Sequence, residues 1–243
     1  MQMGILDKIS EFIGGRNTLY FSGCMERYVF PNISENYKKI LNICGVEFIQ
    51  IDELCCGSPA ISAGYTEDAK ILAAKNYGRF KDHGVGKVIT SCPACYSTLK
   101  TYEKLLPEMK IKTKIEHSTV TIADAIKRGK LKLNKIGKNE KVTIHDPCHL
   151  KHYGLFNETR EILTAIGYNV IEMPHNKENA ICCGGGGGLR ANFPAISTEI
   201  AKSRAKEASN IANFIVTTCP LCYAQLREHC ACKELSEVLI NAI

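Results

Sequence analysis

Ten of the thirteen cysteines in this chain follow one pattern twice, and this repeat constrains the fold more than any other feature. Each copy has a single cysteine, then an adjacent pair followed by glycine, then a Cys-Pro-x-Cys motif. The first copy comprises Cys24, Cys55, Cys56, Cys92 and Cys95, and the second comprises Cys148, Cys182, Cys183, Cys219 and Cys222. Thiols that recur in register predict metal ligation, and soft sulfur ligands select zinc, copper(I) or iron–sulfur clusters.

A disulfide framework is the first alternative for so many cysteines. Such frameworks belong to small secreted domains, whereas this chain has 243 residues and 45% hydrophobic content. Adjacent cysteines also rarely pair with each other, because the ring that they would close is strained. No uncharged apolar run is long enough for a secretion signal or a membrane span. We therefore expect free thiols, a cytoplasmic location and no direct membrane span.

The net charge is +6, and the basic excess gathers between residues 127 and 141. This stretch has no interleaved aromatic side chains for stacking on bases, so it does not indicate nucleic-acid binding. An acidic partner subunit could dock on it, but we favour a solvated linker between two domains. The expected domains are a short amphipathic N-terminal helix over residues 1–17, a first cysteine-bearing domain over 18–135 and a second over 136–243.

The repeat extends from the cysteines to the pattern of predicted helices and strands. Each half begins with a β-prone run that ends at its first cysteine. Expected strands are 18–24, 46–51 and 87–91 in the first half, and 142–148, 168–173 and 213–218 in the second. Expected helices are 39–45, 69–80 and 96–105, then 161–167, 197–208 and 223–228. This alternation predicts two duplicated α/β lobes with parallel sheets, related by pseudo-two-fold symmetry, with the cysteines at strand C-terminal ends.

Each copy supplies five thiols, one more than a tetrahedral ion or a conventional cubane cluster requires. An adjacent pair such as Cys55-Cys56 can reach two different irons or bridge between them. The spacing therefore favours an unusual iron–sulfur cluster. A cubane cluster with a spare cysteine, and zinc in one half, remain open alternatives.

The glycine-rich stretch 184–188 lacks the lysine of a phosphate-binding loop. We interpret it as a loop whose backbone N–H groups bond to cluster sulfur and so tune the reduction potential. On this interpretation the cofactor-binding residues are Gly57, Gly184, Gly185 and Gly186.

The remaining candidates carry weaker signals. His149 and His152 follow a ligand cysteine and serve as helix caps or, in a sharper hypothesis, as proton donors to a thiolate product. His145 and Asp146 are expected to shape the turn before Cys148. Cys44 is expected in the core, and no role is assigned to Cys230 and Cys232, which lie outside the register.

The double motif resembles the cysteine-rich CCG domain, which occurs twice in the B subunit of heterodisulfide reductase from methanogens. The resemblance covers residues 18–228. The run His145 to Leu150 and the glycine-rich motif after Cys182 are most similar to the D subunit of the membrane-linked enzyme and to the iron–sulfur subunits of glycolate and lactate oxidation. The resemblance implies an oxidoreductase subunit with two noncubane [4Fe-4S] clusters, each held by the five cysteines of one half. One [4Fe-4S] cluster with one zinc is the alternative. The lysine-rich, tryptophan-free composition is compatible with an archaeal or anaerobic bacterial source.

Two functions follow from this resemblance. The first is reduction of a disulfide of the CoM-S-S-CoB type, or oxidation of thiols, with Cys55, Cys56, Cys182 and Cys183 at the reacting centre. The second is non-catalytic electron transfer in a flavin-dependent dehydrogenase of lactate or glycolate. The ferredoxin-type run C-x2-C-x2-C-x3-C-P is absent from these residues. The expected partners are therefore a ferredoxin-type iron–sulfur subunit and a flavoprotein, besides a small thiol or disulfide substrate.

Overall fold

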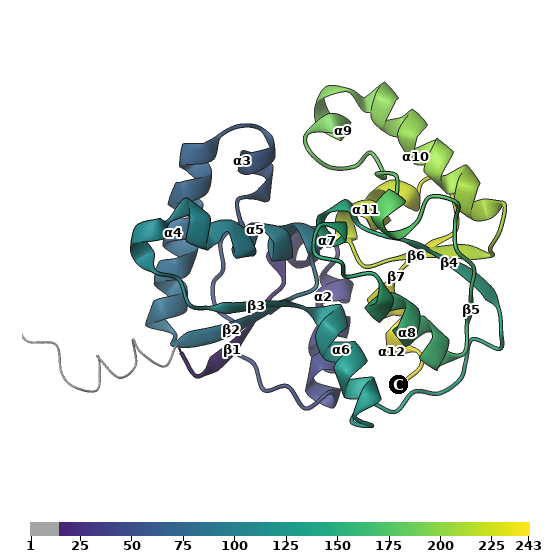
Figure 1. The fold of residues 1–243 in the computed structure, drawn as a ribbon, viewed down its shortest axis with the longest axis horizontal. Helices are drawn as coiled ribbons and strands as arrows, with labels where there is room; N and C mark the ends of the chain where they lie inside the picture. The colour runs from purple at the N-terminus through teal and green to yellow at the C-terminus, as the bar shows by residue number, and fades with distance from the viewer. Residues whose placement is uncertain (1–14) are drawn as a thin grey trace, which may run out of the picture.

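The computed structural model describes residues 15–243 and contains two parallel sheets, one in each half of the chain (Figure 1). The first sheet has the order β1 (Asn17–Phe21), β2 (Val85–Thr90), β3 (Lys114–His117). The second has the order β5 (Asn169–Val170), β4 (Lys141–His145), β6 (Phe214–Thr217), β7 (Cys232–Glu234). The prediction of an α/β fold with parallel sheets is confirmed. The helix predicted over 1–17 lies, up to residue 14, outside the described residues.

The two sheets have the same strand order if the isolated bridge at Ile49 is counted as an edge strand of the first sheet. Ile49 pairs with Leu19 at the edge of β1, in the place that β5 takes beside β4. The strand predicted over 46–51 shrinks to this bridge, because the chain turns away after it to bring the carboxyl group of Glu53 under the loop before Cys24. The strand predicted over 168–173 likewise keeps only the two residues of β5.

The predicted helices are present with earlier starts and with ends within two residues of those predicted, and two further helices longer than five residues were not predicted. The first half contains α2 (Pro31–Ile43), α4 (Thr66–Asp82), α5 (Pro93–Leu105) and α6 (Ser118–Lys127). The second contains α8 (Asn157–Ile166), α10 (Pro194–Ser209), α11 (Pro220–Leu226) and α12 (Leu235–Ile240). Short helical turns are η1 (Met25–Val29), α3 (Ser58–Ser62), η2 (Pro107–Met109), α7 (Cys148–Lys151), η3 (Lys177–Asn179) and α9 (Leu189–Asn192). Within residues 15–243, no helix combines the length and apolarity needed to cross a bilayer.

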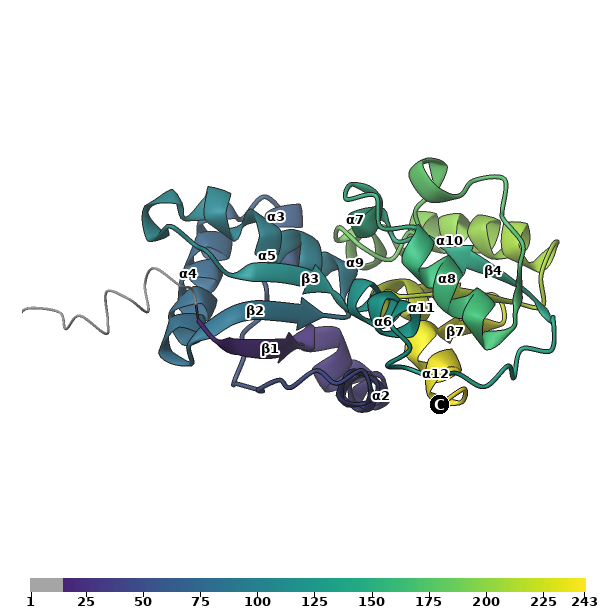
Figure 2. The same ribbon diagram turned by 60° about the horizontal axis from the view of Figure 1, so that its bottom comes forward.

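Four helices form a shared layer between the two sheets (Figures 1 and 2). Helix α2 packs against α12, and α6 packs against α8. Each of these two pairs combines a helix of the first half with a helix of the second. Strand side chains alternate across the sheet: Tyr20 enters this shared core, while Leu19 and Phe21 face the opposite side. Helices α4 and α5 contact β2 of the first sheet, and α10 and α11 contact β6 of the second. The halves are therefore joined by a continuous apolar core.

A carboxyl group is buried where the halves meet. Glu234 precedes α12, and its Oε1 accepts a hydrogen bond from the Tyr37 hydroxyl at 2.7 Å. Its Oε2 accepts from the backbone N–H of Ser236 at 2.6 Å. Burial raises the pKa of Glu234 to about 7, against its ordinary value of 4.5. The shared core thus contains a group that titrates near neutral pH.

We expect Glu234→Gln to make the folding stability less dependent on pH. Because the folded-state pKa is raised, the stabilisation is fully present below the unfolded pKa and is lost as pH rises through about 7. A rise from 4.5 to about 7 corresponds to about 3 kcal/mol. Urea unfolding below pH 4.5 and above pH 7 measures this: the wild type should lose about 3 kcal/mol more than the variant across that window. Equal losses in the two proteins would contradict the assignment.

Candidate metal centres

The structure brings the ten repeated cysteines together as two sets of five. All of them carry free thiols. In the first set hydrogen bonds connect the thiols in the order Cys24, Cys55, Cys56, Cys95, Cys92. In the second set the order is Cys148, Cys182, Cys183, Cys222, Cys219, with Cys183 Sγ and Cys222 Sγ 3.2 Å apart. The two halves therefore build the same five-thiol arrangement from matching positions.

The ends of parallel strands position most of these thiols. Cys24 follows β1, and Cys148 opens α7 just after β4. Cys92 and Cys219 are the N-caps of α5 and α11, and proline follows each of them at the first helical position, where its missing N–H is not needed. The positive end of a helix dipole favours a thiolate at such a cap. Both sets are therefore suited to hold anionic sulfur.

Each set has buried inner thiols and accessible outer thiols. Among the residues predicted at the reacting centre, Cys182 is exposed and Cys55 is half-buried, whereas Cys56 and Cys183 are both only 3% exposed. Cys24 is exposed and Cys148 is half-buried, and the remaining members of both sets are buried. A substrate arriving from solvent would therefore meet the first cysteine of each set and the first member of the adjacent pair.

Hydrogen bonding within each set lowers the pKa of the first member of the adjacent pair, and in the first set also that of Cys92. The pKa of Cys55 is lowered to about 2, first because the Cys24 thiol donates to it and next because Cys56 does. The pKa of Cys182 is lowered to about 2 in the same way, by Cys148 first and Cys183 next. The pKa of Cys24 is raised, mainly by its hydrogen bond to Cys55. A bound metal cation would remove this difference between the thiols, because every thiol that coordinates a metal loses its proton.

Backbone N–H groups of the predicted glycines point at cysteine sulfur. The N–H of Gly57 donates to Cys55 Sγ at 3.5 Å, and the N–H of Gly184 donates to Cys182 Sγ at 3.4 Å. Gly185 N–H donates to Cys183 Sγ, also at 3.4 Å. Gly186 lies against Leu221 of α11 instead. The glycine loops therefore supply donors to the thiols of both halves.

Gly23 is the tightest steric point of the first set. Its φ is +75°, and a Cβ placed on it would lie 2.7 Å from Cys95 Sγ. Ordinary side chains avoid both conditions. Any larger residue here would push the Cys95 sulfur out of its place.

We expect Gly23→Ala to lower the metal content of the first half selectively. The added methyl group displaces the Cys95 sulfur, while the second set keeps its geometry. Anaerobic iron analysis should show about half of the iron bound by the wild type, if the two five-thiol sets bind equal amounts. Gly78, with open space around it, provides the control: Gly78→Ala should retain all the iron. Full iron in Gly23→Ala would contradict the predicted crowding.

Two carboxyl groups that the sequence did not single out as ligands support the loops before Cys24 and Cys148. Glu53 Oε1 accepts from the Ser22 hydroxyl and from Gly23 N–H, both at 2.7 Å. Asp146 accepts two hydrogen bonds from the Arg160 guanidinium, at 2.8 and 3.0 Å. The prediction that Asp146 shapes the turn agrees with this contact. The position of Glu53, two residues before Cys55, was the only local signal for its role.

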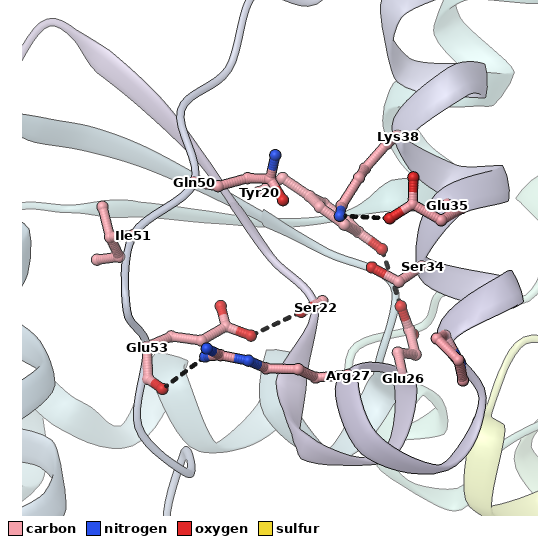
Figure 3. Close-up of a pocket in the computed structure, with 11 residues that line it drawn as sticks. Tyr20, Ser22, Glu26, Arg27, Ser34, Glu35, Lys38, Gln50, Ile51 and Glu53 are labelled. Atoms are coloured by element: carbon pink, nitrogen blue, oxygen red, sulfur yellow. Dashed lines mark hydrogen bonds and ion pairs between the residues drawn. The ribbon is translucent and has the colours of Figure 1, made fainter.

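A polar pocket of about 190 Å³ is lined by residues that neighbour Cys24 and Cys55 in the chain, among them Ser22 and Glu53 (Figure 3). Within it Glu53 accepts from Ser22, and the fully buried Glu26 accepts from the Tyr20 hydroxyl at 2.8 Å. Burial, above all, raises the pKa of Glu26. None of the residues lining the pocket is a cysteine. The pocket therefore supports the cysteine loop and does not open onto the thiols.

The predicted histidines are distributed unevenly around the second set. His145 is 1% exposed, and one of its ring nitrogens lies within 4.8 Å of both Cys183 Sγ and Cys222 Sγ. Burial, followed by the charge of Arg204, lowers the pKa of His145 to about 4. His149 is half-buried, and its pKa is lowered mainly by burial; His152 is exposed. The structure thus adds His145 to the surroundings of the thiols.

Of the three cysteines outside the register, one lies in the shared core and two lie beside the second thiol set. Cys44 is buried in the shared core, as predicted. Cys232 opens β7, and both it and Cys230 pack at the edge of the apolar cluster that includes Cys183, Cys219 and Cys222. The pKa of Cys232 is raised, mainly by burial. These thiols therefore behave as core side chains.

Each half reaches the thiol set of the other half. Helix α5, which carries Cys95, packs against α7, and α11, which carries Cys222, packs against η1. The rings of Tyr96 and Tyr153 meet edge to face with centroids 5.0 Å apart. Phe30 and Tyr223 repeat this contact at 5.3 Å. The two thiol sets therefore adjoin the same interface between the halves.

The comparisons with known proteins agree with this arrangement. The family profile CCG, described as a cysteine-rich domain, matches residues 18–100 and again residues 142–227. The D subunit of the dihydromethanophenazine:CoB–CoM heterodisulfide reductase of Methanosarcina acetivorans is 36% identical over 221 residues, which are 87% of this chain and 54% of the relative. The B subunit of the fumarate reductase (CoM/CoB) of Methanothermobacter marburgensis is 30% identical over 244 residues, 99% of this chain and 47% of the relative.

A third relative is named for a quinone and not for a thiol or a disulfide. The EtfAB:quinone oxidoreductase of Syntrophomonas wolfei is 31% identical over 232 residues, 90% of this chain and 32% of the relative. The chain spans about half the length, or less, of these curated relatives. Among solved structures, the aspartate racemase of Picrophilus torridus aligns over 92% of this chain and 91% of its own, with 10% identity and a TM-score of 0.39, too low to indicate a shared fold.

Proposed function

The chain belongs to the CCG family of cysteine-rich domains, and from this premise we propose that it is the iron–sulfur subunit of a heterodisulfide reductase-like complex. Its activity would be the reduction of a disulfide of the CoM-S-S-CoB type, or the reverse oxidation of two thiols. The observation that carries the proposal is the pair of free five-thiol sets on either side of one interface between the halves.

The donor set fits an iron–sulfur cluster in each half. All five ligands are sulfur, and backbone N–H groups donate to the adjacent pair in both halves. Five thiols exceed the four that a conventional cubane cluster uses, so we propose a noncubane [4Fe-4S] cluster in each half. The first would be held by Cys24, Cys55, Cys56, Cys92 and Cys95, and the second by Cys148, Cys182, Cys183, Cys219 and Cys222.

Two one-electron centres beside one interface suit the chemistry of a disulfide. When bound, the two clusters supply one electron each, which together with two protons convert an S–S bond into two thiols. The chain's own part is to bury the inner thiols and to leave Cys55 and Cys182 accessible, one in each half. A substrate that spans the interface could then place one sulfur at each set.

Partner polypeptides would deliver the electrons. The relatives named as D and B subunits belong, by those names, to enzymes of several subunits. We propose a ferredoxin-type iron–sulfur subunit and a flavoprotein as the partners of this chain, because its two thiol sets adjoin one interface and offer no chain of further clusters within residues 15–243.

Anaerobic purification followed by metal and sulfide analysis tests the proposal. We expect about eight irons and eight sulfides per chain, from two four-iron clusters. The EPR spectrum of the oxidised or reduced protein should change when the heterodisulfide or its thiols are added. About four irons together with zinc would contradict the two-cluster assignment. Spectra indifferent to both thiols and disulfide would contradict catalysis at the clusters.

The likeness to the EtfAB:quinone oxidoreductase, whose name contains a quinone and no disulfide, favours a second candidate function. In it the chain would be a non-catalytic electron-transfer subunit of a flavin-dependent lactate or glycolate dehydrogenase. The same iron content is expected, but a reduced flavoprotein would reduce the clusters and added disulfide would not reoxidise them. Reoxidation by disulfide therefore separates the two candidates.

A further inference from the structure

The two thiol sets differ in a buried polar residue at the end of the strand that leads to the first cysteine of each set. His145 is the last residue of β4, three positions before Cys148, and Phe21 holds the same position before Cys24. The Phe21 ring meets Phe80 of α4 edge to face, with centroids 6.4 Å apart. The second half therefore has an imidazole where the first half has an aromatic pair.

The neighbour of His145 also differs between the halves. In the register that aligns Cys56 with Cys183, Arg204 and Glu207 of α10 correspond to Tyr77 and Phe80 of α4. Arg204 is 1% exposed, and its Nη1 donates to Glu207 Oε2 at 2.7 Å and to the carbonyl oxygen of His175 at 2.8 Å. Glu207 thus balances the charge of Arg204, so the net charge at these two positions is the same in both halves. The halves differ there in the hydrogen bonds that the side chains can donate.

Arg204 fixes the tautomer of His145. Its Nε donates to His145 Nδ1 at 3.2 Å. A guanidinium group has no acceptor, so Nδ1 must accept and the ring proton must be on Nε2. Among the described residues His145 Nε2 has no hydrogen-bond partner although it is buried.

The sulfur atoms of the second set lie near the His145 ring, and cluster sulfur held by them would be a candidate acceptor for this orphaned donor. A ring nitrogen of His145 lies within 4.8 Å of Cys183 Sγ and Cys222 Sγ, and Nδ1 is already taken by Arg204. An unpaired N–H group in the protein interior is costly. A donor held beside ligand sulfur is instead one of the ways in which proteins tune a cluster.

We propose that His145 donates an Nε2–H hydrogen bond to the sulfur of the second cluster, with Arg204 as its positioning residue, and that this makes the second cluster the one of higher reduction potential. The proposal rests on the two-cluster assignment made above. Reduction by a one-electron donor adds one negative charge to the cluster while the proton stays on Nε2, so the hydrogen bond strengthens on reduction. The aromatic pair Phe21–Phe80 offers the first cluster no such donor.

Redox titration of the wild type and of His145→Phe, with dithionite as reductant and EPR as the readout, tests the proposal. The wild type should show two midpoint potentials. The variant, which copies the residue of the first half, should lower the higher potential and leave the lower one unchanged. We expect a shift of at least tenfold in the equilibrium constant of reduction, which is about 59 mV for one electron. An unchanged higher potential, or a shift of the lower one, would overturn the proposal.

Three further measurements separate the possible failures. Phe21→Leu is the matched control in the first half and should leave the higher potential in place. Labelling histidine with ¹⁵N should reveal, by pulsed EPR, a weak coupling that His145→Phe abolishes; a strong coupling typical of a directly bound nitrogen would overturn the donor role. In Arg204→Met the higher potential should also fall, and no change would remove the positioning role.

Iron analysis distinguishes this proposal from the function on which it rests. If the wild type binds fewer than two clusters, the proposed function fails. If the wild type and His145→Phe both bind two clusters and have the same midpoint potentials, only the role of His145 fails.

Discussion

Cys182→Ser and Cys55→Ser are each expected to lower the rate of disulfide reduction at least about 100-fold, a larger loss than supporting residues of metal sites usually cause. Each substitution removes the accessible member of an adjacent pair, whose thiol has a strongly lowered pKa. If the two halves each supply one electron, loss of either site stops the two-electron reaction. Initial rates with reduced viologen and the heterodisulfide measure the effect.

The control for these variants is a cysteine outside both sets. Cys44 is buried in the shared core, and Cys44→Ala should retain the iron content and the rate of the wild type, at a small cost in stability. Circular dichroism should show that the two serine variants remain folded, since they replace accessible or half-buried side chains. Undiminished turnover in either serine variant would rule out the paired-site mechanism.

Asp146→Asn is expected to destabilise the second half by about 2 kcal/mol, because it weakens charge-assisted hydrogen bonds to the Arg160 guanidinium, which keeps Glu172 as its other carboxylate partner. Asp146 is 4% exposed and accepts two hydrogen bonds from Arg160 and one from the backbone N–H of Lys177. It also lies two residues before Cys148, so the loop that carries this ligand should loosen. Urea unfolding gives the stability, and the rate of iron loss to a chelator reports on the loop.

Asp124→Asn is the matched control for the ion pair. Asp124 pairs with Arg128 at 2.9 Å on the surface of α6, with both side chains at least half exposed. Exposed pairs of this kind contribute little, so the variant should stay within about 0.5 kcal/mol of the wild type. If both variants had the same small effect, Asp146 would have no special part in holding the second site.

The sequence was sufficient to predict features that repeat along the chain. The register of the cysteines placed them in two sets, and hydrophobic periodicity located α4, α5, α8 and α10. Gly167, with φ of +92°, ends α8 as expected of a glycine after a helix. These signals are local, because spacing and helix caps depend on neighbouring residues.

Features that depend on contacts between distant residues were not predicted. The edge strands β3 and β7 are only four and three residues long, too few to show a period. Helix α6 packs against α8 across the interface, which no local pattern records, whereas α12 has a local signal that was not used, the capping box of Glu234 and Glu237. Arg204 reaches His145 from a position 59 residues away, and a buried arginine in a helix resembles a surface one in sequence. Only its place opposite Tyr77 in the repeat distinguished it.

The reciprocal pairing of α2 with α12 and of α6 with α8 has the form of an isologous dimer interface within one polypeptide. In such an interface the same patch is used twice, each copy covering the other. A protein with a single copy of this unit would leave that apolar patch open to water and would have to form a homodimer to cover it. Tethering both copies in one chain frees the two patches to diverge. One half could thus acquire His145 and Arg204 while the other kept Phe21, an asymmetry that a symmetric homodimer cannot encode.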